Sequence, residues 1–194
     1  MMRTITIFAL AVGLSGCVSF GAKPPPFLLN LSASTPVVAN ETRTAQATEA
    51  MMISSPLVPQ AIATTRVAVM EGGESISYLK DAVWAETPAR LFQNLLGETV
   101  TAKTGRIVLD ARQFALSPSM QLSGSLKMFG VDAEAGDAVV IYEAALSRNQ
   151  GETIIVRRFE SRVRVNKIEP LPVARALNIA ANNVAIETAV WLAE

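Results

Sequence analysis

The chain has a single thiol, at Cys17, and its position indicates the chemistry that acts on it. Cys17 closes the sequence Leu14, Ser15, Gly16, Cys17, after an uncharged run at residues 4–13 and a start whose one charge is Arg3. That apolar run is too short to span a hydrocarbon core of ~30 Å as a helix. The small residues before the cysteine suit a signal peptidase. The pattern therefore predicts an exported chain that is processed close to its thiol.

This segment resembles the signal of bacterial lipoproteins. In that family the cysteine thiol is diacylated, the chain is cut just before it, and the new amino group is acylated, commonly with palmitate. The resemblance implies a signal peptide at residues 1–16 and a mature chain that begins at the lipidated Cys17. Two or three acyl chains, at ~0.8 kcal/mol for each buried methylene, hold a protein on a membrane. The alternative is an ordinary secretory signal that ends in a cysteine by chance.

The residues after Cys17 bear on where the protein is held. Val18 stands where an aspartate would signal retention in the inner membrane, so resemblance to other lipoproteins implies the periplasmic side of the outer membrane. Residues 17–26 contain three consecutive prolines and form a predicted extended tether. No later segment is long and apolar enough to cross a membrane.

Composition predicts one folded domain at residues 27–194. Half of the residues are apolar and 18% are charged, which excludes disorder as a description of the whole chain. Without residues 1–16 there are 16 basic and 17 acidic residues, a net charge of −1 that gives no global attraction to nucleic acid. With Cys17 acylated no disulfide can form, so the core alone must stabilise the domain.

Turn and capping residues predict an α+β fold. Thr87 and Pro88 have the types expected at the start of a helix, and a second helix is predicted at Val173–Ala193. The segment Asn40–Ala50 is predicted to be a loop or weak helix. Strands are predicted at Phe27–Leu31, Ala63–Met70, Gly105–Leu109, Gln121–Glu134, Ala138–Ser147 and Thr153–Val165. We expect a mixed or antiparallel sheet with the middle helix and the C-terminal helix packed on it.

A histidine-dependent active site is excluded, because the 194 residues include no histidine. That absence removes Ser–His–Asp and Cys–His catalysis and histidine-ligated metal sites. The sequences Ser77-x-x-Lys80 and Lys103-Thr104-Gly105 match two short motifs of penicillin-binding enzymes, but the S-D-N element is missing and the two motifs lie too close in sequence. The carboxylates also lack paired spacing, so the sequence predicts a protein that is not an enzyme, with no metal and no cofactor besides the lipid on Cys17.

Two surfaces are candidates for binding a partner. The last strand places Arg158, Arg162 and Arg164 on one face, where they can meet lipid phosphates or an acidic partner; the alternative is a solvated face that protects a sheet edge. On the last helix a second apolar row lies opposite the core face and consists of Ile179, Ile186 and Val190. A surface helix normally has one apolar stripe, so the second row requires another layer of the same protein or another subunit, including a second copy.

Residues along most of the mature chain resemble the auxiliary lipoproteins of ABC-type transport systems. The most specific piece is the step Trp84, Ala85, Glu86, Thr87, Pro88 that leads into the middle helix. The likeness also rests on the lipoprotein cysteine, Phe27–Leu29, Arg66–Val69, Tyr78, Leu79, Leu91, Phe92 and Leu95. Family members carry no catalytic residue set, so the resemblance implies no active-site residues.

The resemblance implies a non-catalytic subunit of a lipid or hydrophobic-solute transport system. Its partners would be a mammalian-cell-entry-domain protein and the ABC transporter subunits, with the acyl anchor in the outer membrane. The alternative is a structural envelope lipoprotein that tethers peptidoglycan or an outer-membrane assembly factor.

Overall fold

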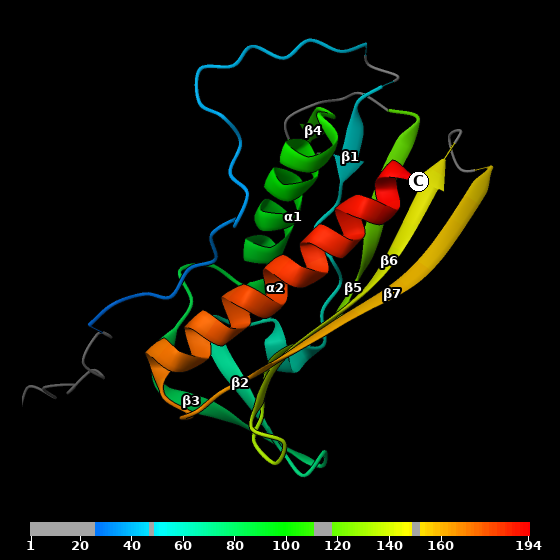
Figure 1. Ribbon diagram of the computed structural model, residues 1–194. Helices are drawn as coiled ribbons and strands as arrows, with labels where there is room; N and C mark the ends of the chain where they lie inside the picture. Colours follow the sequence, from blue (N-terminus) through cyan, green and yellow to red (C-terminus); the bar gives the residue numbers. More distant parts are fainter. Residues whose placement is uncertain (1–25, 47–48, 111–117, 149–151) are drawn as a thin grey trace, which may run out of the picture.

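A seven-stranded mixed sheet and two helices on one of its faces make up the fold (Figure 1). The computed structural model describes residues 26–46, 49–110, 118–148 and 152–194. In chain order the elements are β1 (Met51–Ile53), the short 3-10 helix η1 (Gln60–Ile62), β2 (Arg66–Glu71), β3 (Ser75–Val83), α1 (Pro88–Thr104), β4 (Val108–Leu109), β5 (Met120–Asp132), β6 (Asp137–Arg148), β7 (Thr153–Arg164) and α2 (Pro170–Ala193). The predicted fold class is confirmed.

Strand β5 organises the sheet because it has neighbours along both of its edges. On one edge it pairs antiparallel with β6, which pairs antiparallel with β7. On the other edge β1 and β2 lie parallel to opposite ends of β5. β4 extends the sheet beyond β1, and β3 extends it beyond β2. β7 pairs only with β6 among the described strands, so its other edge is free.

The core lies between the sheet and the two helices. Phe92 of α1 is fully buried and meets Tyr142 of β6 in an edge-to-face contact, with ring centroids 5.1 Å apart. Tyr142 lies over Gly124 of β5, where an added Cβ would come within 2.4 Å of the Glu143 carbonyl oxygen. The α2 residues that the sequence places on the core face, Val173, Leu177, Ala180, Val184 and Trp191, are all buried. Glycine at position 124 thus leaves room for the aromatic contact beneath α1.

Residues 27–46 cross the helices as a segment that we call the strap (Figure 1). The backbone N–H groups of Ser32 and Ser34 donate to the side-chain oxygens of Asn178 and Asn182 on α2, at 2.9 and 2.7 Å. Farther along, the Arg43 side chain donates to the carbonyl of Thr101 on α1. The strap therefore covers one flank of α2 and then turns to α1.

The structure corrects several element predictions. Phe27–Leu31 is not a strand: only Leu29 forms an isolated bridge, to Trp84. Gly105 does not begin a strand but ends α1 in the left-handed conformation, at φ 70°, so the following strand shortens to Val108–Leu109. Gly72 and Gly73 form a hairpin turn into β3, which the sequence analysis missed together with β1.

The ends of the helices also differ in detail from the prediction. Thr87 is the N-cap of α1, but its side chain makes no capping hydrogen bond; its backbone carbonyl instead accepts from the N–H groups of Arg90 and Leu91. α2 begins at Pro170, three residues earlier than predicted. Backbone N–H groups in the first turn of a helix have no partner within the helix. Both helices have prolines in this turn, where the missing N–H costs no hydrogen bond.

Candidate docking surface

The predicted lipidation site, Cys17, lies outside the described residues. The first described segment nevertheless has a defined place. The N–H of Leu29 donates to the carbonyl of Val83, and the carbonyl of Leu29 accepts from the N–H of Ala85, both at 2.8 Å. Leu29 is therefore fixed to the domain where β3 ends, just ahead of α1.

The three motif residues at the start of α1 have structural surroundings. Trp84 is 1% exposed and packs edge-to-face on Phe129 of β5, with ring centroids 5.5 Å apart. Its indole N–H has no hydrogen-bond partner among the described residues. Glu86 is exposed and pairs with Arg90 at 3.3 Å, while Pro88 is the first residue of the helix. These contacts are packing, an ion pair within α1 and the start of the helix.

The apolar row predicted on the last helix faces solvent. Ile179 is 51% and Val190 is 55% exposed, while Ile186 is half-buried. The strap lies on the Asn178 and Asn182 flank of α2 and leaves this row uncovered. The row therefore has no second layer in the described part of the domain.

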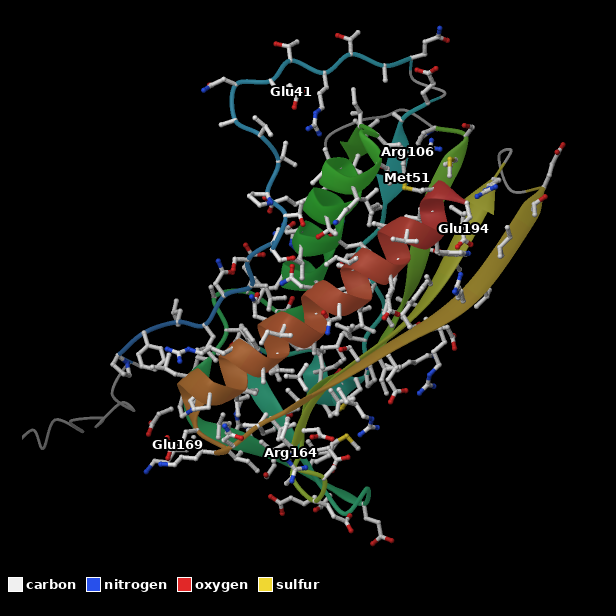
Figure 2. All side chains as sticks on the ribbon, in the orientation of Figure 1. Glu41, Met51, Arg106, Arg164, Glu169 and Glu194 are labelled. Atoms are coloured by element: carbon white, nitrogen blue, oxygen red, sulfur yellow. The ribbon has the colours of Figure 1, made fainter. Side chains whose placement is uncertain are left out.

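The three arginines of the basic strand lie in β7, and carboxylates of the same chain neutralise them. Arg158 and Arg162 both donate to Glu160, at 3.0 and 2.9 Å, and Arg162 also reaches Asp132 at 3.3 Å. Arg164 pairs with Asp137 at 3.5 Å, near one end of the strand (Figure 2). A face with this pairing resembles the solvated alternative more than a phosphate site.

These charge pairs set the ionisation of the β7 face. Hydrogen bonds from Arg158 and Arg162 hold the pKa of Glu160 below its usual value. The pKa of Asp132 is also lowered, chiefly because its side chain accepts a hydrogen bond from the Ala135 backbone N–H and then because of Arg162. The face therefore keeps its carboxylates charged at neutral pH, so its arginines stay paired.

The two faces of β7 have different surroundings. One face packs against α2, which carries the apolar row, and the arginines lie on the other face. Phe159 packs against Trp191 of α2 with centroids 5.6 Å apart, and Ser161 accepts from Asn183 of α2. Because side chains alternate along a strand, Arg158, Glu160 and Arg162 point to the sheet face away from the helices. The free edge of β7 lies between the arginines and the apolar row.

The apolar row and β7 border common hollows. One hollow, of about 220 Å³, is lined by Arg157 of β7 and by Ile186 and Val190 of α2. A second, of about 360 Å³, lies between Val163 near the end of β7 and Ile179 of α2. We call the row Ile179, Ile186 and Val190 together with the free edge of β7 the α2–β7 surface.

The sequence analysis missed an exposed apolar segment at the start of β7. Ile154 and Val156 are 67% and 61% exposed, and Ile155, which alternation places on the same face as the buried Phe159, is still 38% exposed. The reason is that β7 runs past the end of α2, where Arg157 pairs with the terminal Glu194 at 3.5 Å (Figure 1). The three consecutive β-branched residues just before the arginines are the signal that could have found it.

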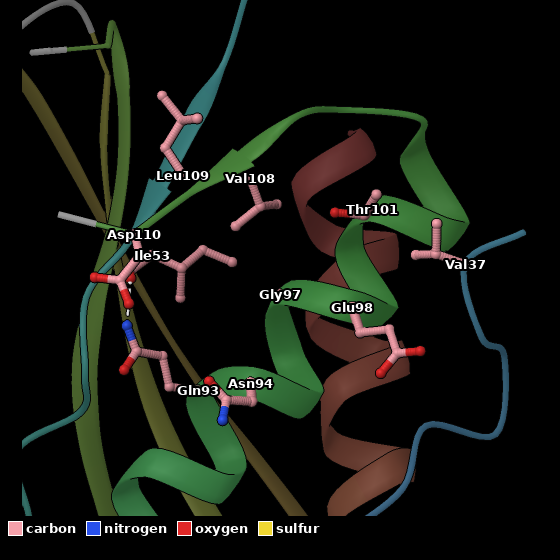
Figure 3. A pocket seen from close by; sticks show the side chains of 10 residues that line it. All are labelled: Val37, Ile53, Gln93, Asn94, Gly97, Glu98, Thr101, Val108, Leu109 and Asp110. Carbon is pink, nitrogen blue, oxygen red and sulfur yellow. Dashed lines mark hydrogen bonds between the residues drawn. The ribbon is translucent and has the colours of Figure 1, made fainter. Parts of the chain in front are cut away.

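Another cavity, a cleft of about 410 Å³, lies beside α1 (Figure 3). Gln93 of α1 reaches across it and donates to the carbonyl of Ile53 in β1 at 2.9 Å, while its side-chain oxygen is buried without a partner among the described residues. Glu98 and Asp110 also line the cleft, but no group of acidic side chains in the described ranges is arranged to hold a metal ion. The Gln93 contact joins α1 to the sheet.

Neither α1 nor α2, the two α-helices among the described residues, combines the length and apolar character that a membrane crossing needs.

Comparisons with known proteins identify relatives of the fold and the sequence. The family described as "ABC-type transport auxiliary lipoprotein component" matches residues 29–189. Protein XCC0632 from Xanthomonas campestris has a similar structure, with a TM-score of 0.64 at 17% identity over 87% of this chain and 92% of that one. A second crystal structure, of an uncharacterized protein, has a TM-score of 0.61 at 17% identity over 75% and 90% of the two chains. No curated protein sequence matches.

Proposed function

Because the chain belongs to the family of ABC-type transport auxiliary lipoprotein components, we propose that it is a non-catalytic subunit of a lipid or hydrophobic-solute transporter. The family match supports the coarser role in ABC-type transport. The proposal adds an acyl anchor at Cys17 on the periplasmic side of the outer membrane. It also adds a mammalian-cell-entry-domain protein as the transport partner.

The observation that carries a docking role is the uncovered apolar row beside a free strand edge. Ile179 and Val190 are each more than half exposed on a helix whose opposite side is fully packed. Burying such a side chain contributes ~1.5–3 kcal/mol, so a partner that covers the row gains affinity there. The function proposed for the domain is therefore to hold subunits in position.

Affinity purification of the lipidated protein from envelopes tests this role. We expect the unaltered chain to co-purify with a mammalian-cell-entry-domain protein and ABC transporter subunits. The double substitution Ile179→Asp with Val190→Asp should reduce that yield. Val38→Asp is the matched control, because Val38 is 69% exposed but lies on the strap. Recovery of peptidoglycan or an outer-membrane assembly factor in place of transporter subunits would support the alternative tethering role.

The anchor is tested separately with a radioactive fatty acid. Cys17→Ser should abolish labelling and leave an unprocessed precursor or a soluble periplasmic form. The labelled wild-type chain should fractionate with the outer membrane on a density gradient. Equal labelling of the serine variant would overturn the assignment of Cys17.

A further inference from the structure

Large apolar side chains are exposed in two places that are distant in sequence, ahead of the bridge at Leu29 and at the start of α2. Leu28 and Leu171 are more than half exposed, and Phe27 and Ile168 are more than a third exposed. None of these four residues belongs to the apolar row of α2 or to the exposed start of β7. We call Phe27, Leu28, Ile168 and Leu171 the entry patch.

Hydrogen bonds between the strap and α2 bring the two parts of the entry patch together. The strap runs in the same direction as α2, because Ser32 bonds to Asn178 and the bond of Ser34 to α2 is one helical turn farther on. Leu171 lies seven residues before Asn178, so both are on the same stripe of the helix. Seven helical residues rise ~10 Å, and the chain from Leu28 to Ser32 spans up to ~14 Å. The start of the strap therefore lies beside the start of α2 (Figure 1).

The entry patch lies at the end of the domain that the chain from Cys17 enters. The next residue, Leu29, is bonded to the last residue of β3. The exposed apolar start of β7 lies at the opposite end, beyond the C-terminus of α2 (Figure 1). The ten peptide units between Cys17 and Phe27 reach at most ~35 Å. An acyl anchor at Cys17 therefore keeps the patch within this distance of the bilayer, at a high local concentration of lipid.

The charges beside the patch suit a phospholipid surface. Residues 166–175 contain the exposed cations Lys167 and Arg175 and one carboxylate, Glu169, which gives this stretch a net charge of +1 (Figure 2). Neither cation forms an ion pair within the described ranges, whereas Arg158 and Arg162 of β7 do. Aromatic and aliphatic side chains with neighbouring lysine or arginine are typical of a bilayer interface, where the apolar groups enter the acyl boundary and the cations stay among the phosphates.

We propose that the entry patch rests on the phospholipid surface of the membrane that holds the anchor. This inference rests on the proposed acyl anchor at Cys17 and adds a second, non-covalent contact with the same bilayer. The contact orients the domain, because the start of α2 then lies at the membrane and its end, with Val190, projects away from it. The apolar row of α2 remains free for a transport partner.

Fluorescence quenching in reconstituted vesicles tests this contact. The lipidated full chain carries an environment-sensitive dye on one introduced cysteine and is placed in vesicles of equimolar phosphatidylethanolamine and phosphatidylglycerol with spin-labelled acyl chains. Dyes at Leu28→Cys and Leu171→Cys should lose fluorescence about twofold, because they enter the acyl boundary. Dyes at the matched positions Val190→Cys and Ile154→Cys should lose almost none. These two residues are similarly exposed but lie toward the other end of the domain, with Val190 ~28 Å farther along α2 than Leu171.

A second variant tests whether apolar side chains make the contact. With the dye at Leu171→Cys, the added change Leu28→Asp should remove most of the quenching, because a carboxylate disfavours entry into the acyl boundary. The matched change Leu28→Ile should retain it. Leu28 is more than half exposed, so neither change disturbs the core, and circular dichroism verifies that both variants are folded.

Equal quenching at all four positions, or none at 28 and 171, overturns the contact and leaves the anchor intact. A dye at 28 or 171 that is shielded from water before vesicles are added also overturns the contact, because another part of the chain or a second copy then covers the patch. Uptake of the dye by the unaltered chain reveals a free thiol at Cys17 and overturns the anchor together with the contact. The expected quenching without co-purified transporter subunits supports the contact and overturns only the transport role.

Discussion

The helices α1 and α2 pack on the same face of the sheet, yet they present different surfaces to solvent. The exposed positions of α1 are polar and include Asn94, Glu98 and Lys103, whereas α2 exposes Ile179 and Val190. The large apolar side chains of α1 are buried inside the domain, so its solvent-facing surface carries no exposed apolar row. The outer surface of α2 keeps these two apolar side chains exposed. The difference favours α2 over α1 as the helix on which a partner would be sought.

The first prediction tests how strongly the α1 side depends on its interior contacts. Trp84→Ala should lower the free energy of unfolding by ~3–5 kcal/mol, because it removes a side chain that is 1% exposed and packed on Phe129. Urea denaturation followed by circular dichroism measures the change. A loss below about 1 kcal/mol would mean that the start of α1 does not depend on the tryptophan.

A second prediction probes the sheet beneath α1. Gly124→Ala should cost ~1–3 kcal/mol, because the new methyl group would collide with the Glu143 carbonyl and with the Tyr142 ring. The same denaturation measurement applies. Gly97→Ala is a suitable control, since its added methyl group meets only the Val108 side chain, at an ordinary 3.5 Å. Equal losses in the two variants would contradict the packing of Tyr142 over Gly124.

The third prediction concerns the exposed row of α2 and sharpens the contrast with α1. Ile179→Asp and Val190→Asp should each change the free energy of unfolding by ~0.5 kcal/mol or less, as surface substitutions usually do, while weakening association. Ile186→Asp should cost more because Ile186 is half-buried. Thermal unfolding and sedimentation separate the two effects. Unfolding of the Ile179 and Val190 variants would assign the row to the domain's own core.

The smallest expected effect is a pH dependence on the outer face of β7. Because the folded-state pKa of Glu160 lies below its ordinary value of 4.5, its contribution to stability is present above that value and is lost as the pH falls through the lowered folded pKa. Glu160→Gln should therefore flatten the dependence of stability on pH in the acid range. Unfolding titrations between pH 6 and 3 measure it. If the free energy of unfolding falls equally in both proteins as the pH is lowered, the solvent-exposed ion pairs of Glu160 contribute nothing measurable to stability.

Local signals in the sequence were sufficient for the regular part of the fold. Residues of turn-forming types at positions 134–137 and 148–151 of the sequence separate three predicted strands that closely match β5, β6 and β7, and Pro88 marks the start of α1. β3 was missed because Gly72 and Gly73, which form the hairpin turn between β2 and β3, are equally compatible with the end of a strand. β1 was missed because its three residues gain their order from parallel pairing with β4 and β5, which are distant in sequence.

The candidate surface was only partly predictable for a similar reason. Helical periodicity places Ile179, Ile186 and Val190 on one side of α2, and their position on the helix was predicted from sequence alone. Whether the strap covers them depends on hydrogen bonds between Ser32 and Asn178, which no local pattern indicates. The pairing of Arg158 and Arg162 with Glu160 agrees with the solvated-face alternative, because alternation along the strand already places this carboxylate on the face of the arginines.

The bridge at Leu29 has a mechanical consequence for an anchored domain. If the chain is held through Cys17, any tension between the membrane and a docked assembly enters the fold at Leu29. There the backbone is bonded to Val83 and Ala85, on either side of the buried Trp84. Ser32 and Ser34 follow Leu29 in the chain, so their hydrogen bonds to α2 bear no tension until the hydrogen bonds of Leu29 break. Tension on the anchor therefore acts on the core beside Trp84 and does not displace the apolar row of α2.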